Sequence, residues 1–353
     1  MENFTLLLKK YADFIVRVGV NPQPGQTLII NCCLEAAPLA RLCVRSAYEA
    51  GARDVLVNWS DNDVSRSRME LGSEEALTDF KSYQLRRYLD YAESEGGVCV
   101  LHLLADDPEV YAGLDGAKIS RVNAAQRKFM APWREYTMND RVQWSIAAMP
   151  SAPWAKKIFP ELDEAAAIEK LWQLIFDVCR VTGGDPVNEW KAHLDRLTGL
   201  KDKMNALDLE SVHFESGNGT DLTVGIADKA VWESAASVSE KGVVFLPNIP
   251  TEEVFTAPHK DKVNGIVYGT KPYVFNGQLI KGFHVTFKDG RVVEHGADEG
   301  AELLGRLLDT DEGARSIGEV ALVPASSPIN RSGALFYSTL FDENAACHIA
   351  FGA

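Results

Sequence analysis

The sequence predicts an α/β fold in which an N-terminal parallel-sheet α/β domain is followed by a mainly antiparallel α+β domain. In the first half, continuous apolar segments, as expected for strands buried on both faces, alternate with segments of helical periodicity. After about residue 208, short strands separated by glycine-containing turns replace this pattern. We therefore predict two domains in the 353-residue chain, residues 1–207 and 208–353.

The alternation in the first half is regular. The apolar runs predict strands at 27–31, 54–59, 97–104 and 142–149, and the helical spacing predicts helices at 2–19, 36–51, 74–95 and 116–131. Two further helices are expected between residues 162 and 205, interrupted at 182–186, where Asp185 suits an N-cap and Pro186 the first helical position. This order predicts a parallel sheet with helices on both faces.

The second half begins with a predicted hairpin over residues 212–224, with a Gly-Asn-Gly turn. Short strands are expected at 265–270, 272–275, 278–288 and 291–295, and one helix near 298–309. The Asp289-Gly290 pair marks another hairpin turn. These features predict a mostly antiparallel sheet.

Composition narrows the class of protein. The net charge of −14 and the pI of about 5.0 disfavour nucleic acid and anionic membranes as partners. The apolar runs are too short for a membrane-spanning helix, and Glu2, Lys9 and Lys10 do not fit a signal peptide. The six cysteines form no CxxC pair, so we expect buried small hydrophobes rather than disulfides or zinc thiolates. A cytoplasmic protein is expected.

Three segments of the second half place a carboxylate or an imidazole at the edge of an apolar run: residues 248–258, 318–324 and 341–350. A buried carboxylate is costly unless it is paired or bound to a metal. Glutamates combined with one histidine form a ligand set that suits zinc, manganese, cobalt or magnesium. These segments therefore indicate a candidate metal site.

Each candidate residue in these three segments also has an interpretation that involves no metal. Glu252 and Glu253 lie in a loop between prolines, which suits a rigidly held ligand but also two solvated glutamates. Glu319 enters an apolar strand, where a salt bridge to an arginine would equally explain it. His348 suits either a ligand or a hydrogen-bonded core histidine. Glu343 lies five residues before it, so a shared site requires a turn between them.

The chain contains no HExxH, GxSxG, GxGxxG or Walker motif. Serine-hydrolase, dinucleotide and nucleoside-triphosphate chemistry therefore have no support.

Taken together, in this order and spacing, four segments resemble one family over the whole chain. They are Asn248–Pro258, Gly318–Pro324, Ser327–Asn330 and Leu340–Ala350. The chain resembles the aminopeptidase T, AmpS and PepS type of metallopeptidase, the M29 or thermophilic aminopeptidase family. The resemblance implies a metal-dependent aminopeptidase that hydrolyses the N-terminal residue from peptides. It also implies two divalent ions (zinc, cobalt, manganese or magnesium) that activate a water molecule.

Residue by residue, the resemblance implies that Glu253 and Glu319 are catalytic carboxylate ligands, one of them bridging both ions. Glu343 matches a further ligand and His348 an imidazole ligand. A homodimer is also implied, in which the N-terminal domain helps to enclose the active site. The family uses a tyrosine and a His-x-Asp ligand pair at positions beyond Ala353, so we expect the C-terminal domain to be incomplete at its end. A polypeptide ending there is expected to lack part of the site and to be inactive or severely impaired.

Two alternatives stay open at this point. A non-catalytic, peptide-binding relative would show affinity for peptides without turnover. A metal-dependent hydrolase of another amide or ester would be separated from an aminopeptidase by a panel of substrates.

Overall fold

The computed structural model describes residues 3–105 and 107–352, which pack into two compact units. Unit 1 comprises residues up to 192 together with 236–250, and unit 2 comprises 193–235 and the residues from 251 onward. The single domain boundary near residue 207 expected from the sequence stays a prediction. Among the described residues, no helix is both long enough and apolar enough to cross a membrane.

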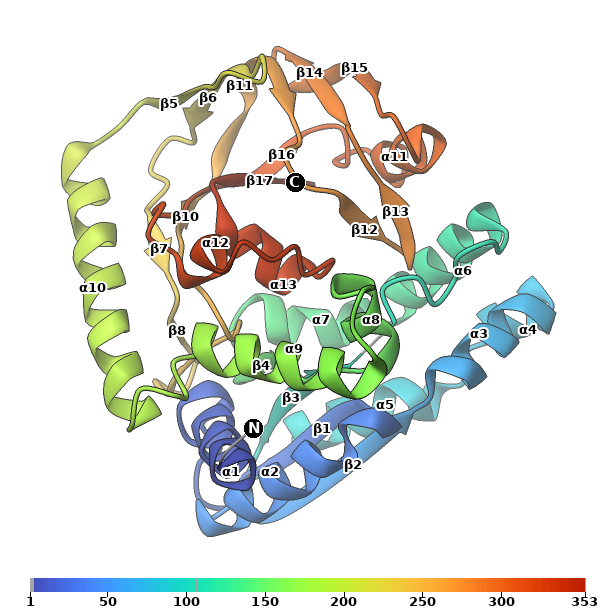
Figure 1. The fold of residues 1–353 in the computed structure, drawn as a ribbon, viewed down its shortest axis with the longest axis vertical. Coiled ribbons are helices and arrows are strands. Elements are labelled where there is room, and N and C mark those ends of the chain that lie inside the picture. Colours follow the sequence, from blue (N-terminus) through green and yellow to red (C-terminus); the bar gives the residue numbers. More distant parts are fainter. Residues whose placement is uncertain (1–2, 106, 353) are drawn as a thin grey trace. The chain divides into compact units, whose positions relative to one another are not determined.

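Unit 1 is built on a parallel sheet with the strand order β2-β1-β3-β4 (Figure 1). The strands are β1 (Thr27–Cys33), β2 (Asp54–Ser60), β3 (Val98–Leu104) and β4 (Trp144–Ala148). In register, Ile29 of β1 lies between Leu56 of β2 and Val100 of β3. The predicted parallel sheet is therefore confirmed, with each strand extended or shortened by a few residues.

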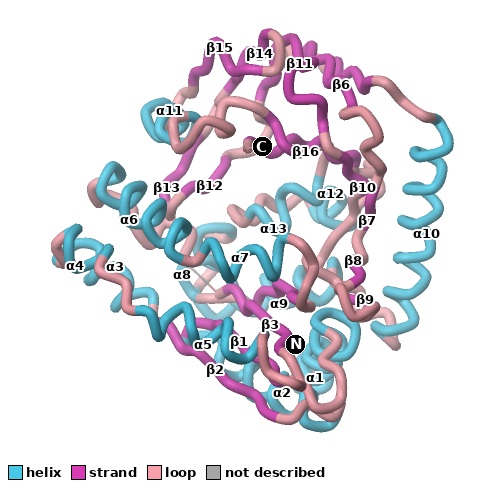
Figure 2. Tube along the Cα trace, turned by 180° about the vertical axis from the view of Figure 1, so that it is seen from behind, coloured by secondary structure: helices cyan, strands magenta, loops and turns pink. Residues whose placement is uncertain are grey.

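Helices cover both faces of this sheet. Ile29, Val100 and Trp133 pack in one cluster on one face, and Leu85 packs against this cluster. The side chains of Leu28 and Ile30 point to the opposite face of the sheet and are fully buried as well. The helices are α1 (Phe4–Phe14), which continues as a π-helix (Ile15–Val20), a 3-10 turn (Leu34–Ala36), α2 (Ala37–Glu49), α3 (Asn62–Leu71), α4 (Glu74–Thr78), α5 (Ser82–Ala92), α6 (Gly116–Phe129), α7 (Ala131–Met138), α8 (Ala152–Ile158), α9 (Glu164–Val178) and α10 (Pro186–Leu207), whose residues from 193 onward belong to unit 2 (Figure 2).

In unit 1 the structure adds helices to those expected from the sequence. The helical segment expected at 74–95 consists of α4 and α5, and α3, α7 and α8 were not predicted. The break at 182–186 between α9 and α10 is confirmed.

Residues 236–250 return to unit 1 and run beside β4. The backbone N–H of Ile146 donates to the carbonyl of Pro247 at 2.7 Å, and the N–H of Ile249 donates to the carbonyl of Ile146 at 2.9 Å. Two short strands, β8 (Ser237–Val238) and β9 (Val244–Phe245), pair with each other in this segment. The chain leaves unit 1 at Pro250, directly before the glutamates of the candidate site.

Unit 2 contains the antiparallel sheets β15-β14-β11-β6-β5 and β17-β16-β10-β7 and the hairpin β12-β13. The mainly antiparallel second half is thus confirmed. Its elements are β5 (Ser211–Glu215), β6 (Asp221–Ile226), β7 (Glu233–Ser234), β10 (Val254–Thr256), β11 (Pro258–Tyr268), β12 (Tyr273–Phe275), β13 (Gln278–Ile280), β14 (His284–Lys288), β15 (Arg291–Gly296), α11 (Ala301–Leu308), β16 (Ile317–Leu322), α12 (Pro328–Ser332), α13 (Thr339–Asp342), a 3-10 turn (Glu343–Ala345) and β17 (His348–Phe351).

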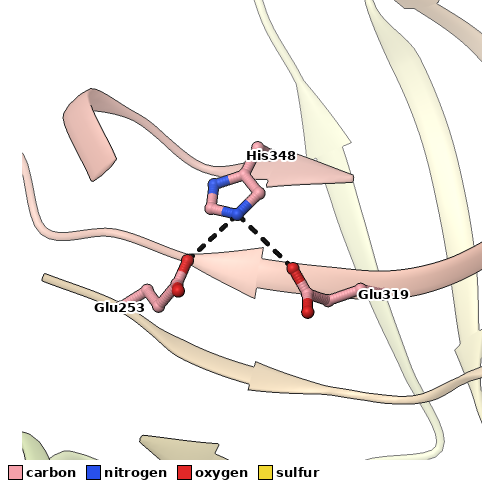
Figure 3. A group of neighbouring side chains, drawn as sticks. All are labelled: Glu253, Glu319 and His348. Atoms are coloured by element: carbon pink, nitrogen blue, oxygen red, sulfur yellow. Dashed lines mark ion pairs between the residues drawn. The ribbon is translucent and has the colours of Figure 1, made fainter. Parts of the chain in front are cut away.

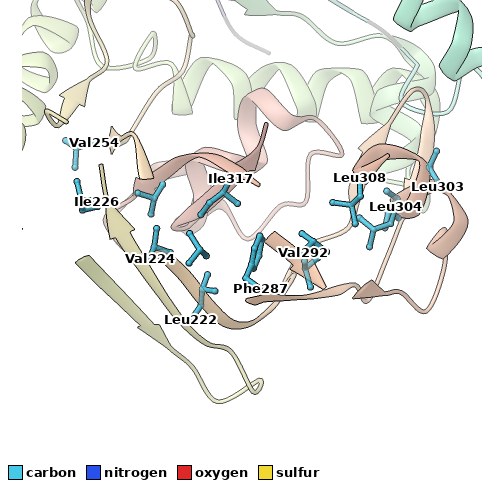
Figure 4. Close-up of a cluster of buried hydrophobic side chains, with 14 of the residues drawn as sticks. Leu222, Val224, Ile226, Val254, Phe287, Val292, Leu303, Leu304, Leu308 and Ile317 are labelled. Carbon is cyan, nitrogen blue, oxygen red and sulfur yellow. The ribbon is translucent and has the colours of Figure 1, made fainter. Parts of the chain in front are cut away.

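An apolar cluster fills the interior of unit 2 (Figure 4). Leu222 and Phe287 from the five-stranded sheet and Leu308 from α11 meet Val254 and Val320 from the four-stranded sheet. The four-stranded sheet therefore buries one face in this core. Its other face is available to carry polar side chains.

Candidate metal site

The four-stranded sheet carries three polar side chains on one face. They are Glu319 on β16, His348 on β17 and Glu253 directly before β10. His348 of β17 lies opposite Ala321 of β16, and Glu319 is two residues before Ala321 on the same strand. Phe255 of β10 pairs with Ala321 from the other side, and Glu253 is two residues before Phe255. Because side chains alternate along a strand, these three side chains point away from the apolar core.

A β-bulge allows Glu319 to face the site. The register between β16 and β17 shifts between Ile317 and Glu319, which places Gly318 as the extra residue. Ile317 and Val320 are both buried in the core cluster although they are three residues apart, which regular alternation does not permit. The bulge therefore keeps Ile317 in the core and leaves Glu319 on the opposite face.

The imidazole lies between the two carboxylates (Figure 3). His348 Nε2 is 3.0 Å from an oxygen of Glu253 and 3.6 Å from an oxygen of Glu319. One ligand atom from each of the three residues lies within 4.8 Å of the others. The side chain of Glu253 is only 8% exposed and that of Glu319 is 35% exposed, so the site has a buried side and a side that is open to solvent.

The backbone sets the orientation of the imidazole. His348 Nδ1 lies 3.2 Å from the carbonyl oxygen of Ala346 and donates to it, so Nε2 is the ring atom presented to the carboxylates. Metal-bound histidines commonly have their second nitrogen fixed in this manner.

The carboxylates also determine the protonation of His348. Burial by itself would lower the pKa of the imidazole, but the interactions with Glu253 and Glu319 and the charge of Glu343 outweigh it and raise the pKa of His348 to about 11. A positive charge is therefore stable between the carboxylates. Two carboxylate oxygens and one imidazole nitrogen are also a ligand set that suits zinc, manganese or cobalt, so the residues fit a divalent ion by both charge and donor type.

Glu343 lies on the 3-10 turn before β17 and interacts electrostatically with this cluster. It is not among the three residues whose ligand atoms lie within 4.8 Å of one another. Burial and then the charge of Glu253 raise the pKa of Glu343 to about 8. Asp342, its neighbour in sequence, has a different role, because it accepts hydrogen bonds from the backbone N–H groups of Phe336 and Ser338.

The raised pKa of Glu343 predicts a dependence of stability on pH in metal-free protein. A carboxyl whose folded pKa exceeds its unfolded value stabilises the fold below pH 4.5, and this contribution is lost as the pH rises to about 8. In the presence of chelator, Glu343→Gln is expected to be more stable than wild type by about 1 kcal/mol or more at pH 8.5, and equally stable at pH 4.5. Urea unfolding at both pH values measures this, with the exposed Glu215→Gln as the control. An equal pH dependence in wild type and Glu343→Gln would contradict the assignment.

Glu252 is buried and belongs to a second polar group. Its side-chain oxygens lie 3.7 Å from His193 Nε2 and 3.8 Å from a guanidinium nitrogen of Arg196, both on α10. His193 Nε2 donates to the carbonyl of Thr251 at 2.8 Å, while its Nδ1 accepts from Arg196 at 2.6 Å. The neutral tautomer with the proton on Nε2 is the form that satisfies both contacts.

These positions settle two of the open alternatives. Glu252 and Glu253 are 0% and 6% exposed, so they are not solvated loop glutamates. The ion pair recorded for Glu319 is with His348 rather than with an arginine. His193 was not among the residues that the sequence indicated. Its role depends on a contact with a residue 58 positions away in sequence, which no local pattern reveals.

Tyr273 of β12 is another residue near the site that the sequence did not indicate. Burial and then the charge of Glu343 raise the pKa of Tyr273 above its usual value. Its phenol therefore stays protonated at neutral pH.

Comparisons with known proteins show the family to which the chain belongs. A family model described as thermophilic metalloprotease (M29) matches residues 4–353. Aminopeptidase 2 from Geobacillus stearothermophilus is 45% identical over 352 residues, covering 100% of this chain and 84% of the relative. Aminopeptidase T from Thermus aquaticus is 41% identical over 352 residues, covering 100% of this chain and 86% of the relative.

A solved structure of wild-type AmpT from Thermus thermophilus superposes with a TM-score of 0.91 at 38% identity, covering 99% of this chain and 86% of that chain. The sequence, the fold and a site that suits a divalent metal ion therefore agree. The chain belongs to the M29 family of thermophilic metalloproteases.

Proposed function

We propose that the protein is a metal-dependent aminopeptidase that releases the N-terminal residue from peptides. One observation carries the proposal: in a chain of the M29 family, Glu253, Glu319 and His348 bring ligand atoms within 4.8 Å of one another. Relatives that are 40–45% identical over the whole chain are named aminopeptidases.

We further propose that the site holds two divalent ions (zinc, cobalt, manganese or magnesium). Glu253, Glu319 and His348 would be ligands, and Glu343 a further one. Three carboxylates support this number, because two cations at close range require several anionic ligands to offset their repulsion. Bound divalent ions supply a nucleophilic water at neutral pH and polarise the scissile carbonyl group.

The side chains around that chemistry have distinct roles in the proposal. Glu253, the more buried carboxylate, holds its ligand oxygen rigidly. Glu319, the more exposed carboxylate, would contribute its ligand oxygen on the side of the site that is open to solvent. His348 contributes Nε2, which the bond from Nδ1 to Ala346 orients.

Four expectations from the sequence stay proposals. They are the domain boundary near residue 207, the homodimer, the cytoplasmic location and the requirement for ligands in addition to the four named here. Light scattering on the purified protein tests the homodimer directly.

The activity is tested with two peptides that differ only at the amino terminus. Protein of verified mass is stripped with chelator and resupplied with zinc, cobalt, manganese or magnesium. We expect leucine to be released from a leucine-initiated peptide in a metal-dependent reaction, and the acetylated form of the same peptide to stay intact. Binding of peptide without turnover would indicate the non-catalytic alternative. Cleavage of the acetylated peptide, or only of non-peptide esters and amides, would indicate another hydrolase.

A further inference from the structure

The segment that carries Glu253 lies just outside the sheet ladder. The first residue of β10 paired with β16 is Val254, which lies opposite Leu322. Ladder hydrogen bonds therefore do not fix the backbone of residues 251 and 252. A metal ligand must be held within a fraction of an ångström, so other contacts have to position this loop.

Asn344 makes such a contact from a fully buried position. Its side-chain oxygen accepts the backbone N–H of Glu252 at 2.7 Å, and its side-chain nitrogen donates to the carbonyl of Leu340 at 3.3 Å. The carbonyl of Asn344 itself accepts from the hydroxyl of Ser327 at 2.7 Å. The amide thus joins the loop before β10 to the turn before β17.

We infer that Asn344 is a positioning residue that sets the distance between the ligand atoms of Glu253 and His348. It lies four residues before His348 in sequence, and it holds the residue directly before Glu253. The bond between the Asn344 side chain and the Glu252 backbone joins the turn that leads to His348 to the loop that leads to Glu253. His193 holds the same loop one residue earlier, through the carbonyl of Thr251.

If Asn344 positions the ligands, its loss should change metal affinity. The inference rests on the metal site proposed above. Without the amide, the N–H of Glu252 loses its buried acceptor and the loop is free to shift. Loss of a residue that orients a ligand weakens metal binding by about 10–100-fold. Asn344→Ala is therefore expected to raise the dissociation constant for zinc by that factor.

Ser327→Ala is the matched control. It removes a buried hydrogen bond from the same turn, the one to the carbonyl of Asn344, but leaves the bond between Asn344 and Glu252 in place. Both variants are expected to lower the urea midpoint of unfolding. Only Asn344→Ala is expected to change zinc affinity, with Ser327→Ala staying within about threefold of wild type.

The experiment is a zinc titration against a competing chelator, with wild type and Glu253→Gln in parallel. A weakened dissociation constant in Asn344→Ala but not in Ser327→Ala supports the inference. Equal zinc affinity in wild type and both variants overturns it while leaving the metal site intact. A wild type that binds no zinc overturns the metal site itself, and the inference with it.

If Asn344→Ala does not fold, Asn344→Leu decides the question. It keeps the approximate size of the side chain and removes both the oxygen that accepts from Glu252 and the donor to Leu340. Zinc affinity weakened by tenfold or more in folded Asn344→Leu supports the inference, and affinity equal to that of wild type contradicts it.

Discussion

Replacing Glu253 with glutamine is expected to lower kcat/KM for a leucine-initiated peptide by about three orders of magnitude or more. The substitution keeps the shape of the side chain but removes the negative charge that lies 3.0 Å from His348 Nε2. A metal ion contributes several kcal/mol to stabilisation of the transition state, and each 1.4 kcal/mol corresponds to about tenfold in rate. Steady-state kinetics after metal resupply measures the effect.

The exposed Glu240→Gln in the same assay is the control, because it removes one carboxylate charge from a residue that is not a member of the cluster. Glu253→Gln should remain folded, because the imidazole of His348 still pairs with Glu319. Activity of Glu253→Gln within tenfold of wild type would contradict the assignment of this residue as a ligand.

Metal binding is expected to release protons, and its affinity is expected to fall steeply in acid. With a pKa of about 11, His348 is protonated in metal-free protein at neutral pH, so a cation must displace that proton. Glu343, with a pKa of about 8, is also largely protonated at pH 6–7 and would release a second proton if it becomes a ligand. We therefore expect about two protons released per site near pH 6.5 and about one above pH 9.

The direction in which zinc affinity changes with pH follows from mass action. Each proton released strengthens binding tenfold for each unit that the pH rises, so lowering the pH from 8 to 6 weakens zinc binding by about 100-fold or more. Calorimetry at one pH in buffers of different ionisation enthalpy counts the protons. Glu343→Gln should release about one proton fewer near pH 6.5. If wild type releases no proton at pH 7, the environment assigned to His348 is wrong.

The site residues that the sequence predicted are those that differ in character from their immediate neighbours in the sequence. Glu319 interrupts an apolar strand, and Glu253 lies between two prolines, so each departs from its surroundings in a manner visible in the sequence. The structure places both beside His348. The bulge at Gly318 has no such signal, because it becomes necessary only when Ile317 and Val320 must both reach one core.

The residues that hold the site in place were not predictable, because their contacts are between distant segments. Asn344 contacts a backbone group 92 positions away, and His193 contacts one 58 positions away. Both are polar residues within a helix or a turn, where a solvent-exposed position is the ordinary expectation. Only the tertiary structure shows that each meets the loop of Glu253.

The fold was predicted where hydrophobic periodicity is strong and missed where it is weak. The strands β1 and β3 of the parallel sheet are continuous apolar runs, and the long helix α9 has a clear apolar face. In α3 the one buried residue is Met69, so its sequence carries no apolar stripe. In α8 a proline follows the N-cap Ser151 by two residues, and a helix of seven residues is too short to show a period.

Anomalous diffraction from zinc-soaked crystals, measured above and below the zinc absorption edge, tests the central claim most directly. We expect an anomalous peak at about 2.0–2.2 Å from a carboxylate oxygen of Glu253, a carboxylate oxygen of Glu319 and Nε2 of His348. The peak should disappear in Glu253→Gln at the same zinc concentration. Zinc bound elsewhere on a fully active protein, with these three side chains free of metal, would contradict the account.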